Sequence, residues 1–178
     1  TVAGSGLQRY ANSPQLDDSG ELIWTEGKCQ STDLSILRPH NEPFSNSGGL
    51  KMLSGNLGAS IIKISSLQEK RHIIKAPAKV FNSQQAVKDA FEANELECDF
   101  ICVVRFQGPK SNGMPELHGL TPILGVLQDK GFSVALVTDG RMSGASGKVP
   151  AAIHVAPEAC DGGAIACIQD GDMILLDA

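Results

Sequence analysis

Hydrophobic positions along this chain follow two different spacings, and each spacing predicts one type of element. Continuous apolar runs at 59–65, 100–106 and 133–138 predict buried strands, and a further extended run ends at Val80 and Phe81. Such runs are typical of a sheet that is covered on both faces or of a closed barrel. Because helices are also predicted between these strands, the pattern indicates an α/β fold.

Apolar residues recur at helical spacing in two places. The first, over about 83–94, follows Asn82, whose side chain can accept a hydrogen bond from an early helical N–H group as an N-cap. The second opens at Thr121–Pro122, where proline suits the first helical turn, and ends near Lys130. Gly131 then supplies a left-handed residue that ends the helix.

The first third of the chain has a different character from the rest. Residues 1–57 are rich in glycine, serine, asparagine, aspartate and proline, and only Glu21–Thr25 has the pattern of a short strand. A long irregular stretch is unusual in a compact domain. We therefore expect an extended segment at 1–57 that packs on the barrel or on a domain outside this sequence, followed by a β/α domain at 58–178.

The last predicted element is a β-hairpin near the end of the chain. Ala164–Ile168 and Met173–Leu176 are largely apolar and flank Gln-Asp-Gly-Asp, which has the composition of a tight turn. Asp170 and Asp172 of this turn are expected to be structural residues.

Composition and charge exclude several classes of function. The 178 residues carry a formal net charge of -5, which argues against non-specific nucleic-acid binding because that requires clustered Lys and Arg. No apolar run approaches the roughly 20 residues that span a bilayer. Thr1 is not Met and no secretory signal is present, so we expect a piece of a longer cytoplasmic protein with no nucleic-acid or membrane partner.

The 5 cysteines match no disulfide or zinc framework. Their number is odd and no pair forms CxxC, so buried free thiols fit better than a closed metal site. The cysteines are Cys29, Cys98, Cys102, Cys160 and Cys167. The 4 histidines match no zinc-finger or metalloprotease spacing either.

Two Gly-rich loops, at 107–117 and 138–148, each follow a predicted buried strand. Loops at strand ends are where α/β proteins usually place their sites, although spacing alone does not separate a site from an ordinary turn. The two loops offer carboxylates, hydroxyls and cations, a set suited to a phosphorylated or carboxylated substrate with a divalent metal. These side chains are Glu116, Asp139, Lys110, Arg141, Lys148, Ser143 and Ser146.

The two loops resemble the signatures of a known enzyme family. Residues 138–147 (TDGRMSGASG) and 108–116 (GPKSNGMPE) are similar to two motifs of the dihydroxy-acid/6-phosphogluconate dehydratase family, which also contains pentonate dehydratases. Residues 53–57 (LSGNL) and 154–159 (HVAPEA) also fit. Within the family, residues 144–154 look most like the 6-phosphogluconate branch.

The resemblance implies a two-domain enzyme in which this chain is the C-terminal domain. That domain is expected to be a swivelling β-barrel-like fold flanked by helices, which closes over cofactors held mainly by an N-terminal domain of the same chain. The implied cofactors are an iron–sulfur cluster, expected to be 4Fe-4S, and Mg²⁺ or Mn²⁺. No cluster ligand is expected in this fragment, which is therefore expected to be inactive alone. The full-length enzyme is expected to be a homodimer.

The resemblance also implies a hydro-lyase reaction. The substrate would be the sugar acid 6-phospho-D-gluconate, which loses water to give 2-dehydro-3-deoxy-6-phospho-D-gluconate in the Entner–Doudoroff pathway. By similarity, Ser143 is the base that removes the C2 proton, and Glu116 is the ligand that this domain donates to the divalent cation. A serine hydroxyl does not ionise unaided at pH 7, so Ser143 needs metal charge nearby.

Further side chains near the second loop are candidates for substrate binding. Lys148 and Ser146 suit a phosphate group, and the alternative for Lys148 is a solvated surface position. Arg141 either binds substrate or locks the loop through Asp139. His154 is either a hydrogen-bonded structural residue or a proton shuttle.

Two other functions remain open at this point. The parent enzyme could act on another 2,3-dihydroxy acid, as a dihydroxy-acid or aldonate dehydratase, or the chain could be a non-catalytic docking module. Intact Ser143 and Glu116 argue against the docking module.

Overall fold

The computed structural model describes residues 11–27, 30–143 and 148–178 and divides into two compact units, Thr1–Ser47 and Gly48–Ala178. Of the helices in these described ranges, none has the length and apolar character needed to cross a membrane.

The first unit contains an antiparallel hairpin of β1 (Asn12–Leu16) and β2 (Leu22–Glu26). Its turn is held by Asp17, whose Oδ1 accepts the N–H groups of Ser19 and Glu21, both at 2.9 Å. Strand β2 confirms the short strand predicted at Glu21–Thr25. Strand β1 contains a proline and polar neighbours, a composition that does not predict a strand.

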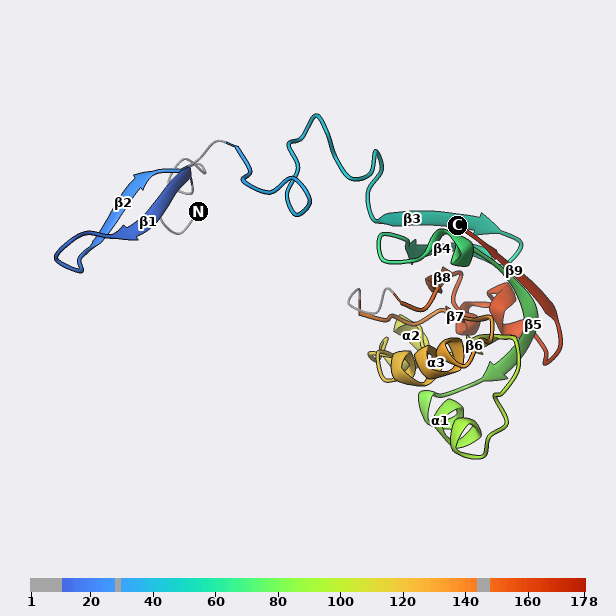
Figure 1. Cartoon of the computed structure of the whole chain (residues 1–178). Helices are drawn as coiled ribbons and strands as arrows, with labels where there is room; N and C mark the ends of the chain where they lie inside the picture. The colour runs from blue at the N-terminus through green and yellow to red at the C-terminus, as the bar shows by residue number, and fades with distance from the viewer. Residues whose placement is uncertain (1–10, 28–29, 144–147) are drawn as a thin grey trace. The chain divides into compact units, whose positions relative to one another are not determined.

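The second unit contains a curled, mixed sheet of 7 strands (Figure 1). The order across the sheet is β3-β4-β8-β7-β6-β5-β9; β5, β6, β7 and β8 are parallel, and β3, β4 and β9 each run antiparallel to their inner neighbour. The strands are β3 (Leu50–Gly55), β4 (Gly58–Lys63), β5 (Ile73–Phe81), β6 (Phe100–Val104), β7 (Val134–Thr138), β8 (Ala151–Ala156) and β9 (Met173–Asp177). The predicted α/β class is confirmed, with a half-barrel in place of a closed barrel.

Each face of this sheet carries its own hydrophobic core. Side chains alternate along β6, so Phe100, Cys102 and Val104 pack toward the helices while Ile101 and Val103 pack on the opposite face. The helical face is covered by α1 (Gln84–Glu92) and α3 (Leu120–Asp129), which lie on one side of the sheet in Figure 1. The short helix α2 (Pro109–Asn112) follows β6 and contributes no buried residue. The opposite face is covered by the 3₁₀ turns η3 (Ala159–Asp161) and η4 (Ala164–Cys167). A further 3₁₀ turn, η2 (Glu69–Arg71), precedes β5.

Both predicted helices are present, but the N-cap of α1 is Ser83 and not Asn82. The Ser83 side chain accepts the N–H of Ala86 at 3.1 Å, while Asn82 Oδ1 accepts a hydrogen bond from Arg105 Nε at 2.9 Å. Helix α3 ends as predicted, with Gly131 at a left-handed φ of 100°. The long-range hydrogen bond to Arg105 therefore engages the Asn82 side chain, which the local sequence predicts as the N-cap.

The predicted C-terminal β-hairpin is wrong. Ala164–Cys167 is a 3₁₀ turn, and β9 pairs with β5, with Ile174 opposite Ala76. The intervening turn docks on β5 instead, because Asp170 Oδ1 accepts the N–H of Val80 at 2.6 Å. Asp172 Oδ2 accepts the N–H of Gln169 at 2.8 Å, so both aspartates hold the turn in place.

Two strands of the sheet have no clear signal in the sequence. Strand β3 falls inside the predicted N-terminal segment 1–57, so the sheet begins before residue 58. Strand β8 is rich in alanine, which is depleted in strands, and it contains His154. The swivelling motion and the packing of the N-terminal segment remain predictions.

Candidate active site

The two Gly-rich loops meet at one edge of the parallel part of the sheet. One follows β6 and the other follows β7, and neighbouring parallel strands deliver their carboxyl ends to the same edge. Glu116 and Arg141 form an isolated parallel β-bridge between the loops, and the N–H of Leu117 donates to the carbonyl of Arg141 at 3.1 Å. Backbone pairing therefore continues past the ends of the strands into the loops.

The carboxylate of Glu116 is the centre of this contact. Its Oε1 accepts the N–H of Ser143 at 2.7 Å and the N–H of His118 at 3.0 Å, and its Oε2 accepts a hydrogen bond from Arg141 Nη1 at 3.2 Å. The Glu116 side chain is 36% exposed and that of Arg141 is 51% exposed. The structure thus brings together three residues selected from the sequence, with the backbone of Ser143 bonded directly to the Glu116 carboxylate.

Exposed polar residues alternate with a buried residue along the second loop. Arg141 and Ser143 are exposed, whereas Met142 between them is buried in the core beside α3, where Thr121 Oγ1 lies 3.5 Å from its sulfur. Arg141 Nε also donates to the carbonyl of Met114 at 2.8 Å. Met142 therefore anchors the loop, and Arg141 locks it to the first loop.

Asp139 is not the partner of Arg141. Its side chain is buried, with the residue 1% exposed, and it accepts three backbone N–H groups from other segments. The donors are Phe106 at 3.2 Å, Gln107 at 2.9 Å and Ala159 at 2.9 Å. The alternative in which Arg141 locks the loop through Asp139 is therefore wrong: the locking partners of Arg141 are Glu116 and the Met114 carbonyl.

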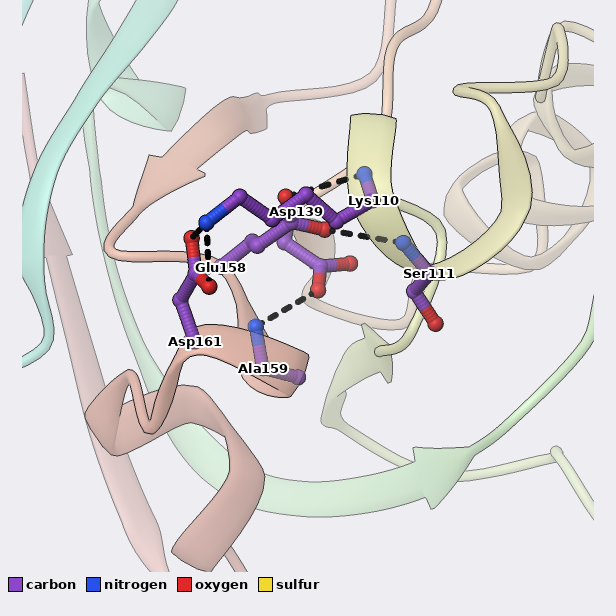
Figure 2. Close-up of polar contacts among 6 residues, drawn as sticks. All are labelled: Lys110, Ser111, Asp139, Glu158, Ala159 and Asp161. Carbon is purple, nitrogen blue, oxygen red and sulfur yellow. Dashed lines mark hydrogen bonds and ion pairs between the residues drawn. The ribbon is translucent and has the colours of Figure 1, made fainter.

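Glu158 is a second buried carboxylate beside the first loop, and its place in the HVAPEA motif is its only signal in the sequence. Figure 2 shows its carboxylate at the start of α2, where it accepts the N–H groups of Lys110 at 3.0 Å and Ser111 at 3.3 Å. Asp161 binds the Lys110 ammonium at 2.6 Å, and this hydrogen bond raises the pKa of Lys110. The segment after β8 thus holds the first loop.

Lys148 lies apart from Glu116 in this structure. Its ammonium binds Asp129 Oδ2 at 2.6 Å, at the last residue of α3, whereas Glu116 lies near the first turn of that helix. At 1.5 Å per residue, the two ends of α3 are about 14 Å apart along the axis. Ser146, the other candidate for phosphate binding, lies outside the described residues.

His154 contributes its backbone to the second loop. Its N–H donates to the carbonyl of Gly140 at 2.9 Å, and the residue adopts a left-handed φ of 56°. Phe106 and Met114, at the start and in the middle of the first loop, also have positive φ, at 60° and 59°. Non-glycine residues in this region are strained and tend to occur at functional sites, where surrounding contacts hold them.

Glu116 has one place left for a cation. A carboxylate has about four lone-pair sites, and donors among the described residues use three of those on Glu116, which leaves one on Oε2 with respect to those residues. Within residues 11–27, 30–143 and 148–178, no group of three or more His, Cys, Asp or Glu side chains could hold a metal ion. The donor set fits a single carboxylate ligand to a divalent cation that has other ligands elsewhere.

A cavity of about 720 Å³ lies on the other face of the sheet, between the β3–β4 hairpin and β9. None of Glu116, Arg141 and Ser143 lines it. The cavity marks the inside of the half-barrel, and the strand-end loops remain the better candidate site because the polar and charged groups converge there.

Comparison with known proteins identifies the family. The family model for the dihydroxy-acid/6-phosphogluconate dehydratase C-terminal region matches residues 35–178. Phosphogluconate dehydratase of Pseudomonas aeruginosa is 58% identical over 177 residues, covering 99% of this chain and 29% of that protein, and that of Escherichia coli K12 is 57% identical over 174 residues, covering 98% and 29%. Dihydroxy-acid dehydratase of Sulfurisphaera tokodaii is 41% identical over 173 residues, covering 89% of this chain and 30% of that protein. The chain thus spans about 29% of the length of the first relatives it matches. It belongs to the dihydroxy-acid/6-phosphogluconate dehydratase family and corresponds to the C-terminal region of its members.

Proposed function

We propose that this chain is the C-terminal domain of a phosphogluconate dehydratase, a hydro-lyase that converts 6-phospho-D-gluconate to 2-dehydro-3-deoxy-6-phospho-D-gluconate. The observation that carries the proposal is the 2.7 Å hydrogen bond between the Ser143 N–H and the Glu116 carboxylate. It joins the base and the metal ligand that the family resemblance assigns to this domain. The identity of 53–58% to phosphogluconate dehydratases, against 41% to the dihydroxy-acid dehydratase, supports the phosphorylated substrate.

In the parent enzyme, an iron–sulfur cluster and a Mg²⁺ or Mn²⁺ ion would supply Lewis-acid chemistry at the C3 hydroxyl and the substrate carboxylate. Glu116 would bind the divalent ion through the open position on Oε2. Ser143 would take the C2 proton on its Oγ. The hydrogen bond from the Ser143 N–H to Glu116 supports this role, because it ties the backbone of Ser143 to the proposed metal ligand. Positive charge from the bound ion would then favour the ionised form of the hydroxyl.

Arg141 would bind the substrate carboxylate. Its guanidinium can form two parallel hydrogen bonds with a carboxylate, and it is half exposed in this structure. Lys148 and Ser146 would bind the phosphate, which requires Lys148 to exchange Asp129 for the substrate. We further propose that the parent protein is a cytoplasmic homodimer in which this domain swivels to close over an N-terminal, cluster-binding domain.

The test uses the full-length parent protein, purified anaerobically. We expect turnover of 6-phosphogluconate, detected as formation of the 2-keto product, and little turnover of gluconate or of branched 2,3-dihydroxy acids. Activity on the unphosphorylated acids alone would assign the enzyme to another branch of the family. Loss of a general base typically costs about 10²- to 10⁴-fold, so Ser143→Ala should lower kcat by that factor. Ser66→Ala, at an exposed serine outside both loops, is the matched control. Unchanged turnover in Ser143→Ala would refute the base assignment and favour a docking role.

A further inference from the structure

Two acidic side chains next to the candidate site are buried: Asp139, at 1% exposure, and Glu158, at 8%. We name these two the anchor carboxylates. A buried carboxylate is costly unless hydrogen bonds compensate for its lost hydration. Here the compensation comes from backbone N–H groups of the site loops and of η3 (Figure 2). The two side chains therefore bind the backbone of the loops themselves.

The contacts of Asp139 join three segments of the chain. Asp139 begins the second loop, Phe106 and Gln107 begin the first, and Ala159 begins η3. Phe106 has a strained, left-handed backbone conformation, and its N–H donates to Asp139 in that conformation. Gly140, next to Asp139, allows the closest approach, because a Cβ there would lie 2.7 Å from the Gln107 Cβ. The bases of the two loops are thus fixed against each other.

Glu158 fixes the next part of the first loop. It accepts the N–H groups at the start of α2, a helix whose own N-cap residue, Gly108, offers no side chain. A Cβ on Gly108 would lie 2.1 Å from Glu158 Oε2, so the carboxylate occupies the space of the missing side chain. Glu158 therefore caps α2 from a distant part of the sequence.

We propose that the anchor carboxylates are positioning residues for the dehydration reaction: they hold the base of the first loop so that Glu116, at its far end, meets Ser143. This inference rests on the proposed function. The two loops touch at their bases, through Asp139 and Gln107, and at their tips, through Glu116 and Ser143. Displacement at the base would move Glu116 relative to Ser143. A misplacement of about 1 Å between reacting groups can cost roughly 10²-fold in rate.

The experiment compares three variants of the full-length parent enzyme. Asp139→Asn and Glu158→Gln keep the side-chain volume but replace one acceptor oxygen with an amide donor, which faces backbone donors at these positions. Lys130→Met is the matched control, because it removes an exposed ion pair, with Glu97, that lies outside both loops.

Two measurements are made on each variant. In the steady-state kinetics, we expect kcat of both anchor variants to fall roughly 10- to 100-fold with KM nearly unchanged, because the groups that act on substrate are displaced but not removed. In hydrogen–deuterium exchange, we expect faster exchange at the amides of His118 and Ser143, which bond to Glu116 and to neither anchor carboxylate. The Lys130→Met control should match wild type in both.

The exchange measurement separates positioning from a local structural role. The proposal is wrong if exchange accelerates only at the amides that bond to the changed carboxylate, or if folded variants keep wild-type kcat. These amides are Phe106, Gln107 and Ala159 for Asp139→Asn, and Lys110 and Ser111 for Glu158→Gln. If Asp139→Asn does not fold, Glu158→Gln decides by the same two measurements. If the wild-type parent has no dehydratase activity, the proposed function fails, while exchange at His118 and Ser143 still tests the positioning.

Discussion

At the scale of single residues, the pairing of Arg141 with Glu116 combines good geometry with a small contribution to stability. Both side chains are substantially exposed, at 51% and 36%, and exposed ion pairs contribute about 0–1 kcal/mol. Exchange of this pair for a substrate carboxylate or a metal ion therefore costs little. Two backbone N–H groups also bond to Glu116 and do not involve the Arg141 side chain, so they would hold the carboxylate if Arg141 moved away.

Arg141→Lys in the full-length enzyme should weaken substrate binding. Lysine keeps the charge but loses the planar fork, and a hydrogen bond to a charged group contributes about 1.5–3 kcal/mol, so KM for substrate should rise roughly 10- to 100-fold. Kinetics and the thermal midpoint are measured together, and the midpoint should change little. Arg38→Lys, in the first unit, is the control. An unchanged KM would mean that Arg141 only locks the loops.

The meeting of Ser143 and Glu116 could be predicted from sequence because both follow apolar strands that lie next to each other in the sheet. The partners of the other charged side chains could not. Lys148 binds Asp129 and Asp139 binds backbone N–H groups, and neither choice has a periodic signal. Such contacts depend on which segments tertiary structure brings together.

At the scale of elements, the N-cap of α1 shows how a distant segment changes a local choice. Arg105 binds Asn82 Oδ1 and also donates to the carbonyls of Ala166 and Ile168, at 2.7 and 3.0 Å. Arg105, directly after β6, therefore connects η4 to Asn82 before the start of α1, and Ser83 caps the helix. Helical spacing predicted the helix correctly because its apolar face is local, whereas the cap depends on Arg105.

The cap assignment predicts a stability difference in the 178-residue chain. Ser83→Ala removes the acceptor for the Ala86 N–H, so it should lower the free energy of unfolding by about 1 kcal/mol. Ser83→Asp retains an acceptor and should restore most of the loss. Urea unfolding followed by circular dichroism measures both. Equal stability of Ser83→Ala and the wild type would assign the cap elsewhere.

At the scale of the whole molecule, the same division between local and distant contacts explains which parts of the sheet could be predicted. Strands β4, β6 and β7 have continuous apolar runs, and each of them has a neighbouring strand on both sides in the sheet. Strand β9 was assigned to a hairpin because its partner, β5, is far away in sequence. Strand order in a curled sheet is set by such distant pairings.

The second unit also has the features of an independently folding domain. Each face of its sheet has a buried cluster, with Ile101 and Val137 on one side and Phe100 and Leu124 on the other. Both clusters are built from residues of Gly48–Ala178. A core that is complete in this way does not depend on cofactors for its packing.

Folding of this chain should not require the cofactors that the proposed reaction needs. The 178-residue chain should fold cooperatively yet acquire no iron–sulfur cluster when it is incubated anaerobically with iron and sulfide, and it should not turn over 6-phosphogluconate. Among the described cysteines, Cys102 is fully buried and burial raises its pKa, which disfavours the thiolate that binds iron. Cys160 and Cys167 are exposed, so the expectation of buried free thiols is wrong for these two. Two exposed thiols are fewer than the roughly four that usually hold an iron–sulfur cluster. The full-length parent, treated in parallel, should gain broad visible absorbance and activity. Stable cluster absorbance in the 178-residue chain after gel filtration would place cluster ligands in this domain and contradict its proposed role as the domain that supplies the base and one carboxylate.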